Sequence, residues 1–165
     1  MWKSALAAAV LATSAALAQA QELKIGYVNS ERVLRESAPA KAAQAKLEAE
    51  FSRREKDLAE LAQRLKEASE RLEKDAPTLS ESERQRRQRE LVELDREFQR
   101  RRREFQEDLN QRRNEELAAV LERANRVIRQ IFEQEKYDLI LQEVVMASPR
   151  ADITKKVIDA LNNGK

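Results

Sequence analysis

The chain of 165 residues contains no cysteine and no histidine, and it has only 2 glycines and 3 prolines. Without cysteine there can be no disulfide scaffold, and without either residue the commonest bases, nucleophiles and soft metal ligands are missing. Aromatic residues make up 4% of the chain, too few for a large compact core. These absences exclude a multi-domain enzyme, an all-β sandwich and a disulfide-stapled domain.

Charged residues, in contrast, are abundant and balanced. They make up 38% of the chain, against roughly 25% in ordinary soluble domains. The 32 basic and 30 acidic residues leave a net charge of +2. High charge with low hydrophobicity is also typical of disorder, but balanced charge and periodic apolar residues favour long, solvent-exposed helices.

Residues 1–20 have the layout of a secretory signal peptide. Lys3 supplies a positive charge, residues 4–17 form an uncharged, alanine-rich run, and Ala18-Gln19-Ala20 follows as a small-residue cleavage motif. The run is shorter than the roughly 20 apolar residues that span a bilayer, which argues against a membrane anchor. We expect export of the chain with cleavage after Ala20; a cut after Ala18 is the alternative.

Two long helical patterns fill the middle of the chain. Residues 40–75 and 81–136 are rich in good helix formers and contain neither glycine nor proline. Pro77 lies between them, and Ser80 with Glu83 matches a capping box at the start of the second helix. A short loop between long helices predicts an antiparallel hairpin. We therefore expect an arm at residues 40–116 with its tip near 76–80, and a base made of residues 21–39 and 117–165.

The apolar residues of both helices agree on one register. In a hairpin folded at Pro77, facing residues should have numbers with a constant sum, and Phe51–Phe105 and Leu58–Phe98 meet this condition. Such aligned layers are what an antiparallel coiled coil requires. The register also places Arg54 opposite about Arg101, so the seam is interrupted and the arm should bend and splay. The predicted arm core consists of Phe51, Leu58, Leu61, Leu65, Leu91, Leu94, Phe98 and Phe105.

The base is predicted to contain a small sheet and a final helix. Residues 23–29 alternate as a strand does, and residues 137–142 and 143–147 resemble two further strands joined by a tight reversal. Residues 152–155 can begin a last amphipathic helix, with Gly164 after its end.

Oligomerisation is expected to complete this β-body. Three short strands leave open edges and uncovered apolar faces. The second helix also carries a wide apolar surface beyond residue 116, where the hairpin offers it no partner. We expect the subunit interface to include Ile25, Val28, Val120, Val127, Ile128, Ile131, Leu139 and Leu141.

Arginines crowd the first half of the second helix. Residues 84–103 contain nine arginines and four acidic residues, a local excess of five positive charges. A solvated helix face that only aids solubility is one interpretation, and electrostatic capture of acidic clients or anionic lipid head groups is the other. Nucleic acid is disfavoured because stacking aromatics are missing. The candidate contacts are Arg84, Arg86, Arg87, Arg89, Arg100, Arg101, Arg102 and Arg103.

The sequence contains no recognisable catalytic constellation. Its acidic residues alternate with basic ones at helical spacing, and a phosphate-binding glycine-rich loop is missing. We therefore predict that the protein is not an enzyme and uses no cofactor and no metal.

The order of these segments resembles the Skp (OmpH-like) family of periplasmic chaperones. The most specific segments are KIGYVNSERVL at 24–34, KYDLILQ at 136–142 and DITKKVIDAL at 152–161, with the charged hairpin between them. The resemblance implies an α+β, mostly α fold, in which three chains build a central β-body and their helical hairpins project around a cavity.

The same resemblance implies a function and partners. It implies an ATP-independent holdase that binds unfolded outer-membrane β-barrel proteins in the periplasm, with anionic lipid or lipopolysaccharide as a second ligand class. The alternative is a structural coiled-coil adaptor or tether in the cell envelope. Such a tether should have a stiff, fully apolar seam, which this arm lacks.

Overall fold

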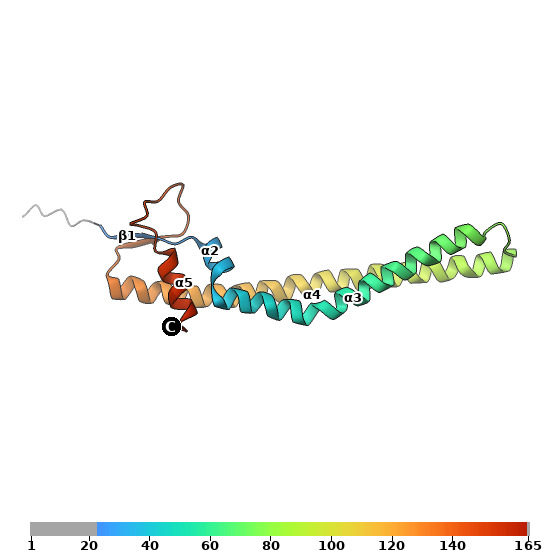
Figure 1. The fold of residues 1–165 in the computed structure, drawn as a ribbon, viewed down its shortest axis with the longest axis horizontal. Helices are drawn as coiled ribbons and strands as arrows, with labels where there is room; N and C mark the ends of the chain where they lie inside the picture. The colour runs from blue at the N-terminus through green and yellow to red at the C-terminus, as the bar shows by residue number, and fades with distance from the viewer. Residues whose placement is uncertain (1–22, 165) are drawn as a thin grey trace, which may run out of the picture.

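The computed structural model describes residues 23–164, and the predicted signal peptide lies outside this range. Two long helices form a hairpin that projects from a small base, and both ends of the described chain contribute to that base (Figure 1). This is the mostly α, α+β architecture that the sequence predicts. The elements are β1 (Ile25–Tyr27), α2 (Ser30–Glu36), α3 (Ala38–Asp75), α4 (Glu81–Glu135), β2 (Leu139–Leu141) and α5 (Thr154–Asn162).

Side-chain caps fix where the helices begin. Asn29 Oδ1 accepts a hydrogen bond of 2.9 Å from the Arg32 N–H at the start of α2. Ser80 Oγ accepts one of 3.3 Å from the Glu83 N–H at the start of α4. The Ser80 hydroxyl also donates to the Glu83 carboxylate at 3.2 Å. The predicted capping pair therefore forms, although the carboxylate of Glu83 meets the serine side chain instead of the serine N–H.

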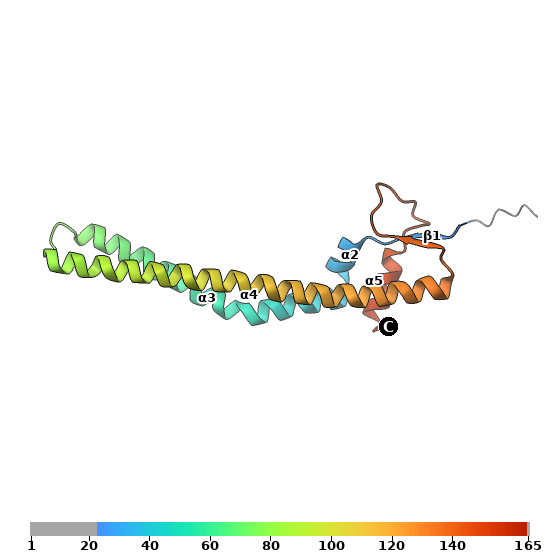
Figure 2. The same ribbon diagram turned by 180° about the vertical axis from the view of Figure 1, so that it is seen from behind.

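The hairpin core contains the aromatic pair that the register predicts. The rings of Phe51 and Phe105 meet edge to face with their centroids 5.7 Å apart. Phe51 and Leu61 are buried, and the other predicted core residues of the arm are half-buried. Along the arm, α3 passes from one side of α4 to the other (Figures 1 and 2). A two-helix arm with so narrow a buried stripe has little packing to hold it straight.

A ladder of ion pairs joins α3 to α4 in the half of the arm nearest the base. Each step of four residues along α3 is matched by a step of four residues back along α4, as antiparallel helices require. Its members are Lys46 with Glu116, Glu50 with Arg112 and Arg54 with Asp108. Among residues 23–164, the only other ion pair between these helices is Asp75 with Arg87 at the tip, at 2.7 Å.

Arg54 is less disruptive to the seam than the sequence suggests. Its guanidinium lies 2.8 Å from the Asp108 carboxylate. It also lies over the rings of Phe51 and Phe105, at 5.4 and 5.8 Å from their centroids. Arg54 and Arg101 line one hollow between the helices, as the register predicts, but the long Arg54 side chain extends past Arg101 to Asp108 and covers the aromatic pair. Arg101 instead pairs with Glu97 on its own helix.

The sheet of the base is smaller than predicted. β1 and β2 pair in parallel, with Ile25 beside Leu139 and Tyr27 beside Leu141. Residues 143–147 form no strand, and the Val145 side chain is 98% exposed. The predicted tight reversal after β2 does not form, because the chain leaves β2 and crosses to the opposite edge of β1. There the Tyr27 N–H donates to the Ala151 carbonyl at 2.7 Å.

Part of the predicted interface is buried inside the single chain. Val28, Val120, Val127 and Ile131 are all nearly inaccessible to solvent, and Ile128 packs partly against the core. Another chain is therefore not what covers these residues, because α2 and α5, which lie outside the hairpin, bury this part of α4 in the core of the chain itself. The core residues that these two helices and their flanks contribute are Val33, Ile153, Val157, Ile158 and Leu161.

Candidate functional site

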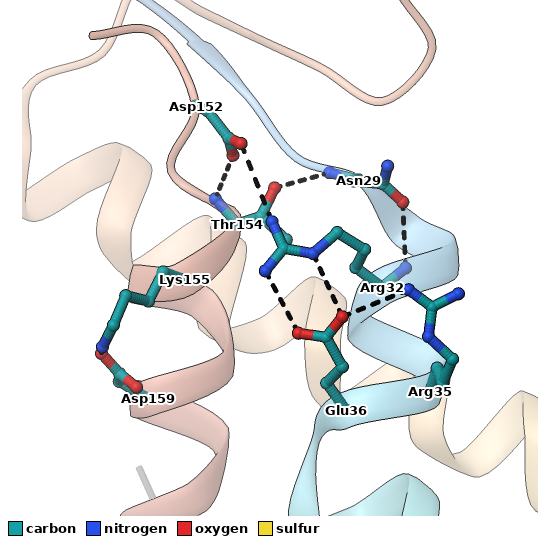
Figure 3. Close-up of polar contacts among 8 residues, drawn as sticks. All are labelled: Asn29, Arg32, Arg35, Glu36, Asp152, Thr154, Lys155 and Asp159. Carbon is teal, nitrogen blue, oxygen red and sulfur yellow. Dashed lines mark hydrogen bonds and ion pairs between the residues drawn. The ribbon is translucent and has the colours of Figure 1, made fainter. Parts of the chain in front are cut away.

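A polar cluster fastens α5 to the segment that begins α2 (Figure 3). Thr154 is fully buried, and its Oγ1 accepts a hydrogen bond of 2.9 Å from the Asn29 N–H. Asp152 Oδ1 accepts one of 2.8 Å from the Thr154 N–H. On the other side, the Arg32 guanidinium donates two hydrogen bonds, of 3.2 and 3.1 Å, to the Glu36 carboxylate and lies 3.9 Å from Asp152. The cluster ties the two ends of the described chain together.

The electrostatics of this cluster suit structure more than catalysis. Hydrogen bonding from Thr154 lowers the pKa of Asp152 below its ordinary value. The hydrogen bonds from Arg32 lower the pKa of Glu36 in the same way. Both carboxylates are therefore held in the ionised form and already accept hydrogen bonds, so neither is poised as a general base near neutral pH.

The structure distributes the arginines of residues 84–103 around α4 and gives most of them acidic partners. Five pair with an acid three or four residues away on α4, and Arg87 reaches Asp75. Within residues 23–164, Arg89, Arg102 and Arg103 make no ion pair. Spacing in the sequence could have identified Arg102, because no acid stands three or four residues from it.

Several of these arginines still share one surface. Arg86, Arg89, Arg96, Arg100 and Arg103 line a shallow hollow on α4. The hollow also contains acidic side chains, so its positive charge is diluted but remains in excess. Of the eight predicted contacts, all but Arg87 are exposed.

The outward side of the small sheet is the second exposed surface. Ile25 and Leu139 stand side by side across the strands and are 42% and 45% exposed. Leu141 is 37% exposed, and in the following loop Met146 is 89% exposed. We call Ile25, Leu139, Leu141, Val145 and Met146 the apolar sheet patch. Exposed apolar side chains gathered on one side of a sheet, as those of Ile25, Leu139 and Leu141 are, are typical of interaction sites.

The sequence predicts only some of the residues of the apolar sheet patch. Ile25, Leu139 and Leu141 are among the eight predicted interface residues, whereas Val145 and Met146 are not. Their exposure follows from the missing strand at 143–147, which periodicity alone could not reveal.

Neither a metal centre nor a membrane span is found in the described part of the chain. Within residues 23–164, no three acidic side chains come close enough to hold a metal ion. No helix in this range combines the length and the apolar character that crossing a bilayer demands.

Comparisons with known proteins agree with this architecture. The Skp chaperone of Yersinia enterocolitica is 26% identical over 146 residues, covering 87% of this chain and 89% of that protein. The Skp chaperone of Pectobacterium atrosepticum is 25% identical over 151 residues, covering 90% of each. A solved OmpH-like outer membrane chaperone of Caulobacter crescentus shares the fold, with a TM-score of 0.72 at 21% identity over 87% of this chain and 86% of that one.

The sequence also matches the model of a protein family. The family described as outer membrane protein (OmpH-like) matches residues 24–161, from the start of the sheet to the end of α5. Since this match spans most of the chain, the protein belongs to the OmpH-like family.

Proposed function

We propose that the protein is an ATP-independent holdase chaperone that binds unfolded outer-membrane β-barrel proteins in the periplasm and keeps them from aggregating. The observation that carries the proposal is the projecting α3–α4 arm in a chain whose family relatives are named chaperones. A long, thinly packed arm offers a large adaptable surface. Many weak contacts on such surfaces give useful avidity without a deep pocket.

Self-association is the second part of the proposal. We propose that the apolar sheet patch forms the contact between copies and that the assembly is a homotrimer. Burying large apolar side chains such as Met146, now 89% exposed, would favour association. Three arms would then surround a shared cavity, with the bases joined at one end.

Export to the periplasm and lipid binding are the third part of the proposal. The alanine-rich N-terminal segment, with cleavage after Ala20, would deliver the protein to the periplasm. Arg89, Arg102 and Arg103, which make no ion pair within residues 23–164, are the arginines best placed to meet anionic lipid or lipopolysaccharide.

A structural adaptor or tether is the competing function. The ion-pair ladder of the proximal arm favours it, because the ladder stiffens that half against bending. The distal half has no such ladder, and its only ion pair between helices within residues 23–164 is the one at the tip. A tether should be stiff throughout, so the holdase remains the proposed function.

Light scattering separates the two functions. A urea-unfolded β-barrel protein is diluted into buffer without nucleotide, alone or with this protein. A holdase should suppress the rise in scattering at near-stoichiometric amounts. Unchanged aggregation beside an intact, folded assembly would overturn the holdase and favour the adaptor.

A further inference from the structure

One side of the base half of α4 is free of charge. Its residues recur at spacings of three or four, and they include all three asparagines of this highly charged helix. We call them the neutral strip. The neutral strip consists of Asn110, Asn114, Leu117, Ala118, Leu121, Asn125, Ile128 and Phe132.

The rest of the described chain leaves the neutral strip largely uncovered. Leu117 and Phe132 are 40% and 37% exposed, while Leu121 and Ile128 are half-buried. The asparagines and Ala118 are exposed. The wide apolar surface of α4 is thus split in two: one half is buried in the core beneath α5, and the neutral strip beside it faces outward.

The neutral strip continues into the arginine hollow. Steps of seven residues lead back from Asn110 to Arg103 and Arg96, both of which line the hollow. A seven-residue repeat drifts by only about 20° per heptad around a straight helix. One side of α4 therefore changes from basic near the tip to uncharged near the base, and Glu107 is the acid at the junction.

We propose that this side of α4 is a track that holds an extended segment of an unfolded polypeptide. The arginine end binds carboxylates, and the neutral strip binds apolar side chains and peptide groups. The proposal rests on the holdase function and deepens it by naming the surface that retains the client. An asparagine amide offers two donors and an acceptor to peptide groups whatever the sequence of the client. A strip without charge also avoids the cost of desolvating an ion against an apolar segment.

The small exposed area argues for a polypeptide segment over a second copy of this chain. A stable subunit interface buries about 800 Å² on each partner. No large apolar side chain of the neutral strip is more than 40% exposed, so the strip by itself offers little apolar area to such an interface. Exposed asparagines would also be left in the seam of a helix-to-helix contact, where an unpaired polar group is costly.

Two adjacent alanines provide a matched test. Ala118 lies on the neutral strip, Ala119 lies a third of a turn away on a charged face, and both are exposed. The chain has no cysteine, so Ala118→Cys and Ala119→Cys can each be labelled at one position with a polarity-sensitive dye. A urea-unfolded β-barrel protein is the probe, and light scattering on the same samples records whether aggregation is suppressed.

The proposal predicts that the dye at position 118 shifts to the blue when the client is added, while the dye at 119 changes little. Equal responses at both positions, or none at 118 while aggregation is suppressed, would overturn the track and leave the holdase standing. A dye at 118 that is already blue-shifted without client would show that a second copy covers the strip, and would also overturn the track. If wild type fails to suppress aggregation, the holdase itself fails.

A charge placed in the neutral strip gives a second readout. Ala118→Glu puts an ion among the apolar contacts of the neutral strip, whereas Ala119→Glu adds the same residue one position further along the helix, on the charged face. Both variants should stay helical, because glutamate is a good helix former. The proposal predicts faster client dissociation, roughly threefold to tenfold, for Ala118→Glu only; equal dissociation rates would count against it.

Discussion

At the scale of single residues, Gly26 is a position where the base has no free space for a side chain. A Cβ added at this position would lie 3.1 Å from Ile153 Cδ1, 3.2 Å from Tyr137 Cε1 and 3.3 Å from Ile140 Cγ1. All three neighbours belong to or pack against the core, so they have little freedom to move. Glycine is therefore required here by close packing of β1 on the core.

Gly26→Ala should destabilise the base by about 1–3 kcal/mol, the usual cost of overpacking. Urea unfolding followed by circular dichroism measures the change. Gly164→Ala is a comparison in which packing plays no part: its φ of +69° is strained for alanine, but nothing lies within 4 Å. A loss below about 0.5 kcal/mol for Gly26→Ala would contradict the packing argument.

Lys136 ends α4 in the left-handed conformation, with φ of 54°. This conformation costs a side-chain-bearing residue roughly 1–2 kcal/mol, and glycine is the usual residue there. Lys136→Gly should therefore stabilise the protein by about 0.5–1 kcal/mol after the entropy of glycine is counted. Lys136→Ala removes the exposed side chain beyond Cβ but keeps the Cβ that strains this conformation, so it should be close to neutral. Urea midpoints test both, and a loss of stability in the glycine variant would refute the argument.

At the scale of helices, the arm divides into a ladder-supported proximal half and a looser distal half. Arg112 is the hub of the ladder, since it contacts Glu50 at 3.3 Å and Glu116 at 3.0 Å. Local stability should follow this division, because regions with fewer tertiary contacts open more easily.

Arg112→Gln should loosen the proximal half alone. Backbone amides around residues 46–54 and 108–116 should exchange with deuterium faster, while those of the base keep their protection. Arg89→Gln is the matched control, because Arg89 makes no ion pair within residues 23–164. If both variants exchange like wild type, the ladder does not support the arm.

Paired and unpaired arginines of α4 should contribute differently to client binding. Two double variants remove equal charge. The first replaces Arg89 and Arg103, which are unpaired within residues 23–164, by glutamine, and the second replaces the paired Arg84 and Arg101 by glutamine. Long-range attraction depends on total charge, so both double variants should associate more slowly and with less salt dependence. Only the first double variant removes guanidinium groups that are free to hold a carboxylate. The client should therefore also dissociate faster from this variant alone, by roughly threefold to tenfold. Stopped-flow mixing with an acidic, urea-unfolded barrel protein tests this; identical dissociation would show the arginines to be a solubilising surface.

At the scale of the whole molecule, folding of the base is tied to its carboxylates. Hydrogen bonding lowers the pKa of Asp152 through Thr154, of Glu36 through Arg32 and of Glu135 through Lys156. A pKa that is lower in the folded state than in the unfolded state adds stability above the unfolded value, about 4 for carboxyl groups. That stability is lost as the pH falls through the folded value.

Stability should therefore be nearly constant from pH 8 to pH 5 and decline below about pH 4. The chain has no histidine, so no side chain of ordinary pKa titrates between these limits. Urea midpoints measured across this range test the expectation. A decline that already begins between pH 7 and pH 5 would mean that other groups control folding.

The arm could be predicted from the sequence, and the base only in part. Helix boundaries and the Phe51–Phe105 register depend on local caps and on periodicity, both of which are written in neighbouring residues. The cover that α5 provides over Val127 depends on contacts between the two ends of the chain, which periodicity does not record. The pattern of residues 143–147 likewise predicts a strand, because it does not record that the chain crosses to the far edge of β1 there.

The candidate surfaces follow the same division. The arginine stretch is visible as composition, but which guanidinium groups lack an acid partner depends on the side-chain arrangement around α4. The neutral strip escaped the sequence prediction because its apolar members were assigned to a single surface with Val120 and Ile131. Only the packing of α5 separates the buried half of that surface from the exposed half.

The central claim is that several arms together hold an unfolded client without nucleotide. The most direct measurement is the molar mass, by size-exclusion chromatography with light scattering, after a urea-unfolded β-barrel protein is diluted into an excess of this protein. We expect one soluble complex with the mass of three chains and one client, and circular dichroism should show the client unfolded within it. A client that precipitates while this protein elutes at its unchanged mass would contradict the account.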